Sequence, residues 1–242
     1  MGPWATVALF DQITRRTPIG REQDHLRLMI DCDPTIPDRS AWILAHLRAS
    51  VAACGGDGPK GGQAREAMPE SPGPYLVAAA KRLESAGAEL LAMACNTAHF
   101  WYDQIASAVG IPMLNLIEVT GQAAAIRCGR GRRIGLMATE ATVRMGLYPR
   151  AMERLGMELV TPDDPNLAEI VKGIWQVKQG QINLGRQTLT SQARALIARG
   201  ADGLILGCTD ISVVIADGDL PVPVIDSTVA MAERIIAEAR GD

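Results

Sequence analysis

The chain has 242 residues, of which 48% are hydrophobic and 21% are charged, and its formal net charge is −3. This composition excludes a mainly disordered chain, and no apolar run approaches the ~18 residues of a membrane span. The weak negative charge, without any basic cluster, argues against a nucleic-acid partner. Five cysteines without a CxxC pair disfavour a disulfide framework or a zinc ribbon. Because the chain does not open like a signal peptide, the cytoplasm is the expected compartment.

Predicted helices and strands alternate along the chain. A helix starts at Trp4, and a buried strand over 26–32 and a helix over 37–48 follow it. The order then continues with helix 75–85, strand 89–94, helix 97–109, strand 133–138, helices 142–155 and 184–198, strand 203–207 and helix 228–239. Alternation of this kind is typical of α/β folds with parallel sheets.

Residues 50–74 differ in composition from the rest of the chain. They hold six glycines and four prolines in 25 residues and show no apolar period. This pattern predicts a surface loop, which is either a lid over a site or an insertion. The insertion is favoured, because lengthening a surface loop costs little free energy.

An internal repeat suggests two related halves. Residues 87–96 and 200–209 both run from a glycine through a buried strand to a cysteine, Cys95 or Cys208, eight positions after the glycine. We therefore predict two pseudo-symmetric α/β domains, 1–115 with 216–242 and 116–215. Each is expected to be a short parallel sheet flanked by helices. The two cysteines would end equivalent strands, beside a site in the cleft between the domains.

The repeat also predicts a missing strand. The second half opens with strand 133–138, whereas the first half opens directly with the helix at Trp4. We expect that this strand either precedes Met1 or is lacking from this half. A chain without it would leave backbone groups unpaired and would be poorly stable.

Cys95 and Cys208 each precede a predicted helix, where a thiol is expected to have a lowered pKa. Two thiols on opposite sides of one carbon atom would suit inversion by two bases, without a metal or a cofactor. The alternatives are two small buried side chains, a Cys–His hydrolase with His99, or a zinc site, whose usual ligand spacing is absent. Cys32, Cys54 and Cys128 are expected to be inert.

Four segments resemble the cofactor-independent aspartate/glutamate racemases. In chain order they are Met1-Gly2-Pro3, Ile36-Pro37-Asp38-Arg39, Cys95-Asn96-Thr97-Ala98-His99 and Gly207-Cys208-Thr209-Asp210. This is also their order in that family, and the resemblance covers nearly the whole chain. The resemblance implies two pseudo-symmetric α/β domains, an active site in their cleft and a homodimer. It also implies two-base catalysis by Cys95 and Cys208 on a small amino-acid substrate, with no cofactor.

The resemblance further assigns the substrate-binding residues. Arg39 would hold the side-chain carboxylate of aspartate or glutamate, and Lys178 would be a second cation. Independently, Lys178 shares a predicted apolar helix face with Val171 and Ile174, where snorkelling to the helix end is the alternative explanation. The polar positions around the α-carboxylate and amine would be Asn96, Thr97, Thr139, Thr142 and Thr209.

Several departures keep other functions open. Asp31 and Asp33 add negative charge near Arg39, and Asp210 stands where the family commonly has glutamate. Within the superfamily the alternatives are a hydantoin racemase, a maleate isomerase or an arylmalonate decarboxylase. The decarboxylases keep one cysteine, so the intact pair disfavours them. A catalytically silent paralogue that acts by binding is an alternative of another class.

Overall fold

The structure, a computed structural model, describes residues 2–54 and 68–241. Most of the loop predicted at 50–74, and the side chain of Cys54, lie outside the described residues. Both ends of the predicted loop are helical in the structure. Its first residues, up to position 54, belong to helix α2 (Arg39–Cys54), and its last two begin helix α3 (Gly73–Ser85).

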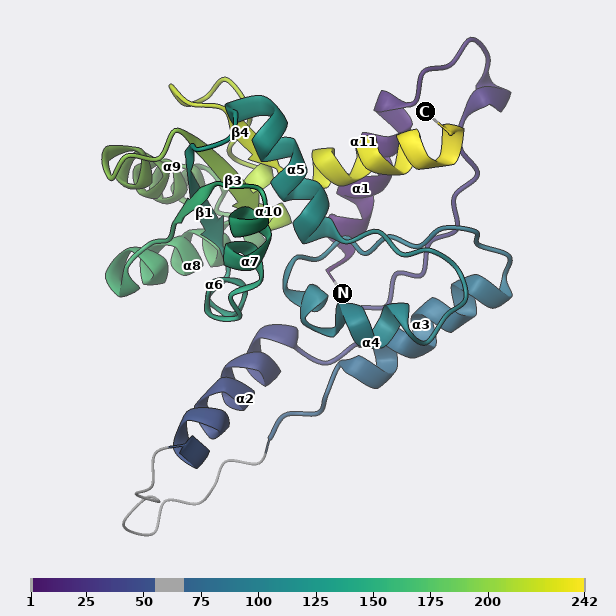
Figure 1. Cartoon of the computed structure of the whole chain (residues 1–242), viewed down its shortest axis with the longest axis horizontal. Coiled ribbons are helices and arrows are strands. Elements are labelled where there is room, and N and C mark those ends of the chain that lie inside the picture. Colours follow the sequence, from purple (N-terminus) through teal and green to yellow (C-terminus); the bar gives the residue numbers. More distant parts are fainter. Residues whose placement is uncertain (1, 55–67, 242) are drawn as a thin grey trace.

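A four-stranded parallel sheet organises the C-terminal half (Figure 1). Its strands are β1 (Arg133–Ala138), β2 (Glu158–Val160), β3 (Gly203–Gly207) and β4 (Val224–Asp226), in the order β2-β1-β3-β4. The predicted strands 133–138 and 203–207 are confirmed to the residue. They are the two central strands, and central strands of parallel sheets are continuous apolar runs.

Helices cover both faces of this sheet. Ile134 and Leu136 pack with α5 (Leu116–Cys128) and α7 (Leu147–Arg154), whereas Met137 packs with α8 (Asp164–Lys178) and α9 (Ile182–Ala198). Because successive strand residues point to opposite faces, β1 serves both cores. The predicted α/β class, a small parallel sheet flanked by helices, is confirmed.

The remaining helices gather beside this layered unit. α1 (Pro3–Arg16) packs along α11 (Ser227–Arg240), and α2 contacts α6 (Glu140–Arg144). These contacts join the N-terminal half to the sheet-bearing half (Figure 1). The other elements are the short helices η1 (Glu22–Asp24), η2 (Thr97–Trp101), α4 (Tyr102–Ala106) and α10 (Thr209–Ser212).

The strands predicted in the first half are mostly wrong. Residues 26–32 form no strand, and segment 89–94 makes only one parallel bridge, Leu91 to Met113. Strands need a neighbour for their backbone groups, and within the described residues segment 89–94 has this single partner. The sheet expected in the first half is thus reduced to one bridge.

Two predicted helices differ in length. Helix 142–155 is interrupted between α6 and α7, where Gly146 takes a left-handed φ of 67°. Glycine is favoured in that conformation because it has no Cβ. Helix 97–109 is instead the pair η2 and α4, which ends at Ala106.

The predicted domain boundaries stay a prediction. Strand β4, which we assigned to the first domain, pairs with β3 of the second, while α11 of the first domain packs on α1. In the described part of the chain, every helix is too short or too polar to cross a membrane.

Candidate active site

The carboxyl ends of β1 and β3 form the edge where most of the predicted site residues gather. Ala138 is in register with Gly207, so Thr139 and Cys208 follow these strands side by side. β1 and β3 are neighbours from which the sheet continues in opposite directions, to β2 and to β4. In open α/β sheets, ligands bind outside the carboxyl ends of the strands at such a switch point.

Three threonines from both halves meet at this edge. Thr97 Oγ1 lies 2.9 Å from Thr142 Oγ1 and 3.1 Å from Thr139 Oγ1, and the last two are 3.0 Å apart. Thr139 also caps α6 by accepting a hydrogen bond from the Thr142 backbone N–H. The structure thus brings three predicted site residues into direct contact.

Asn96 links the same segment to α7, α11 and β3. The Tyr148 hydroxyl donates to Asn96 Oδ1 at 2.6 Å, and Asn96 Nδ2 donates to Ser227 Oγ at 3.0 Å. The Ser227 hydroxyl donates in turn to the Leu206 carbonyl at 2.9 Å. Asn96, Tyr148 and Ser227 are buried, so this chain fixes the amide orientation. These hydrogen bonds connect Asn96, the residue after Cys95, to β3, the strand that directly precedes Cys208.

Removing the Tyr148 hydroxyl is expected to destabilise the protein. Tyr148→Phe leaves Asn96 Oδ1 buried without its donor, which costs about 1–3 kcal/mol of the free energy of unfolding. Urea denaturation measures the difference. The matched control is Tyr75→Phe, because the Tyr75 hydroxyl bonds the exposed Glu70. Equal free energies of unfolding for the two variants would show that the buried hydrogen bond from Tyr148 to Asn96 does not stabilise the fold.

His99 is a buried link between backbone segments. Its Nε2 accepts from the Leu116 N–H at 2.9 Å, so the proton is on Nδ1, which donates to the Cys95 carbonyl at 2.8 Å. Burial lowers the pKa of His99 to about 4, which keeps the ring neutral at pH 7. Both ring nitrogens are occupied by backbone groups. The arrangement therefore offers no base to the Cys95 thiol, contrary to the Cys–His hydrolase alternative.

Cys208 differs from the prediction in its acidity. Its Sγ donates to Asp210 Oδ2 at 3.5 Å, and burial together with the Asp210 charge raises the pKa of Cys208 to about 12. The expected lowering by a helix N-terminus is wrong here, because α10 has only four residues and desolvation outweighs it. Cys208 is therefore a thiol at neutral pH. Cys95 is half-buried at the edge of the first-half core.

Lys178 lies beside the same carboxylate. Its Nζ is 3.6 Å from Asp210 Oδ2 and 5.3 Å from the centre of the Trp175 ring. Val171, Ile174 and Lys178 all belong to α8, as predicted, and Lys178 is its last residue. Ile174 is buried and Lys178 is exposed, as expected for a lysine that reaches solvent at the helix end. Thr209, half-buried, is the first residue of α10 and directly follows Cys208.

Arg39 begins α2, and its hydrogen bonds lie within its own segment. Its Nη1 donates to the carbonyls of Ile36 and Pro37 at 3.3 Å, and its buried Nε has no hydrogen-bond partner. Among the described residues, no hydrogen bond or ion pair joins Arg39 to the threonine cluster or to Cys208. Asp31, which was expected to weaken Arg39, is paired with Arg82 at 2.7 Å.

Sequence reasoning missed three residues of this region: Tyr148, Ser227 and Trp175. Ser227 could have been found, because it follows the second hydrophobic-Pro-hydrophobic step of the repeat, at a strand end. Tyr148 and Trp175 lie within helices and carry no motif. Only their contacts with Asn96 and Lys178 single them out.

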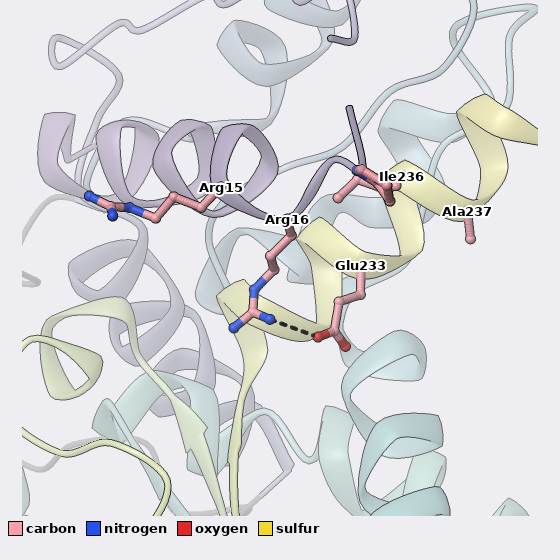
Figure 2. Close-up of a pocket in the computed structure, with 6 residues that line it drawn as sticks. Arg15, Arg16, Glu233, Ile236 and Ala237 are labelled. Carbon is pink, nitrogen blue, oxygen red and sulfur yellow. Dashed lines mark hydrogen bonds and ion pairs between the residues drawn. The ribbon is translucent and has the colours of Figure 1, made fainter. Parts of the chain in front are cut away.

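A separate surface pocket lies between α1 and α11 (Figure 2). It has a volume of about 460 Å³, and the Arg16–Glu233 ion pair, 3.2 Å long, crosses it. Both charges are exposed, so the pair contributes little to stability. Among the described residues that line this pocket there is no cysteine, and the carboxyl edge of the sheet remains the candidate site.

Comparisons with known proteins give the family and the fold of the chain. A family model described as Asp/Glu/hydantoin racemase matches residues 1–235. The broad-specificity amino-acid racemase RacX of Bacillus subtilis is 27% identical over 162 residues, which are 67% of this chain and 70% of that protein. A glutamate racemase of Desulforudis audaxviator is 35% identical over 136 residues, 52% of this chain and 45% of that protein. The structure of Picrophilus torridus aspartate racemase superposes with a TM-score of 0.78 at 30% identity, covering 99% of this chain and 90% of that one.

Proposed function

Because the chain belongs to the Asp/Glu/hydantoin racemase family, as its cysteine motifs predicted, we propose that it racemises an acidic amino acid, aspartate or glutamate. The similarity to an aspartate racemase structure and to a glutamate racemase sequence supports this substrate class. The observation that carries the proposal is the meeting of both cysteine motifs at one edge of the sheet, through Asn96, Ser227 and Leu206.

The reaction is a proton exchange at the α-carbon. One cysteine, as thiolate, removes the α-proton, and the thiol of the other delivers a proton to the opposite face. The raised pKa of Cys208 keeps it protonated in the resting protein, which suits it to the role of proton donor. After turnover the two protonation states are exchanged. The threonine cluster and Asn96 supply hydrogen-bonding groups for the substrate's α-carboxylate and amine.

The test is the behaviour of the purified chain in D2O. L-aspartate and L-glutamate are incubated separately, and proton NMR and circular dichroism follow deuterium incorporation at the α-carbon and loss of optical rotation. We expect both signals for at least one of the two acids and much slower turnover of L-alanine, which has no distal carboxylate. Equal turnover of alanine would contradict the substrate class, and no exchange at either acid would contradict the activity.

Arg39 is expected to set the affinity for the distal carboxylate. Its buried Nε has no hydrogen-bond partner, and loss of a charge-assisted contact between a guanidinium and a carboxylate costs roughly 2–5 kcal/mol. Arg39→Ala should therefore lower kcat/KM for the acidic substrate by about 30-fold or more. Kinetics with the acid and with alanine, together with a thermal melt, check this. An equal loss on both substrates would remove Arg39 from this role.

A further inference from the structure

We propose that Trp175 is a positioning residue, which holds the Lys178 ammonium beside Asp210 so that it can receive the distal carboxylate of the substrate. The inference rests on the proposed function and deepens it. It assigns the substrate's acidic specificity partly to an aromatic side chain outside the two cysteine motifs.

The first observation is the exposure of Trp175. The large apolar side chains Leu167, Ile170 and Ile174 of α8 are buried, but Trp175 is 55% exposed. Burial of an indole ring removes more apolar surface from water than burial of most side chains. A largely exposed tryptophan therefore contributes little of this hydrophobic stabilisation. Packing of the core therefore does not explain its place. The face of its ring instead contacts the ammonium of Lys178, about one turn further along the helix.

The second observation is the geometry of the ammonium group. Lys178 Nζ lies 5.3 Å from the centre of the Trp175 ring, within the range of a cation–π contact. On another side the same atom is 3.6 Å from Asp210 Oδ2, which belongs to α10. The ring and the carboxylate together hold the end of a flexible side chain in one place. Because the lysine side chain is already ordered, binding of a ligand to its ammonium costs less conformational entropy.

The third observation is the position of this ammonium relative to the reacting group. Asp210 Oδ2 also accepts the hydrogen bond from Cys208 Sγ, so one carboxylate oxygen joins Lys178 to the cysteine. An ammonium has three N–H donors, and Asp210 and the ring do not satisfy all of them. A carboxylate of the substrate can accept a remaining one. Lys178 is also 43% exposed, so its ammonium is accessible to an incoming ligand.

Kinetics of two Trp175 variants test the role. Trp175→Leu is expected to raise KM for the acidic substrate about three- to tenfold, with kcat within about twofold of the parent. Trp175→Phe keeps an aromatic face and should restore KM to within about twofold. KM for alanine should not change in either variant. Ile126→Ala is the control, because Ile126 is an 84% exposed apolar residue on α5, away from this site.

A second readout needs no turnover. The chain has four lysines, Lys60, Lys81, Lys172 and Lys178, so reductive methylation with ¹³C gives few NMR signals, and Lys178→Arg identifies that of Lys178. In the parent, the ring current of Trp175 should move this signal upfield. Trp175→Leu should abolish the shift, and Trp175→Phe should keep part of it. Titration with aspartate should move the signal at lower concentrations in the parent than in Trp175→Leu.

The outcomes separate the two proposals. If the parent exchanges no α-proton but its Lys178 signal responds to aspartate more strongly than that of Trp175→Leu, the proposed function fails and the positioning role stands. If Trp175→Leu leaves the Lys178 signal in place, or moves it without weakening aspartate binding, the positioning role is wrong. Parallel losses of kcat for aspartate and alanine, not rescued by phenylalanine, would also overturn it.

Discussion

Replacing either Cys95 or Cys208 with alanine is expected to lower racemisation of the acidic substrate by about 10³-fold or more. Each cysteine serves one face of the α-carbon, and a positioned acid or base typically contributes 10²- to 10⁴-fold to the rate. Inversion needs both groups, so loss of one cannot be offset by the other. Folding should be little affected by Cys95→Ala, because Cys95 is only half-buried.

Deuterium exchange distinguishes the two single variants. Cys208→Ala keeps Cys95 and is expected to exchange the α-proton of one enantiomer with D2O without inverting it. Cys95→Ala keeps only Cys208, whose raised pKa holds it as a thiol, so this variant should exchange the α-proton of either enantiomer far more slowly. Exchange is followed by proton NMR from L- and D-substrate separately. Cys32→Ala is the matched control, because this exposed cysteine lies outside both motifs. Full racemisation by either site variant would disprove two-base catalysis by this pair.

Lowering the pH from 7 to 4 is expected to destabilise the protein by about 3 kcal/mol through His99 alone. The pKa of His99 is lowered from 6.5 to about 4 in the folded chain by burial. Between these values the unfolded chain binds the proton and the folded chain does not. The stabilisation is therefore complete above pH 6.5 and is lost as the pH falls towards 4.

The matched variant is His99→Gln, which cannot titrate but can offer an acceptor to Leu116 N–H and a donor to the Cys95 carbonyl. Urea denaturation at pH 7, 5.5 and 4 measures the free energy of unfolding of both proteins. The parent should lose about 3 kcal/mol more than the variant over this range. Since other titrating groups are common to both, parallel pH profiles would show that His99 does not titrate as its burial requires.

Local sequence patterns were sufficient to predict the central strands of the sheet, because each of these strands is recognisable from its own residues. The central strands β1 and β3 are continuous apolar runs, because both of their faces are covered by helices. Strands β2 and β4 have only three residues each, too few for a recognisable period. The segment predicted as strand 26–32 has strand-like composition but no neighbour to pair with among the described residues. Composition alone does not reveal this.

The repeat identified Cys95, Cys208 and the polar residues beside them, although of the two cysteines only Cys208 follows a strand in the structure. The tertiary structure decided what these residues touch. Asn96 meets Tyr148 and Ser227, which lie 52 and 131 positions away in the chain. The acidity of Cys208 was predicted with the wrong sign, because its burial and its neighbour Asp210 outweigh a short helix. Burial and long-range contacts are properties of the packed chain, whereas strand ends and helix starts are encoded by neighbouring residues.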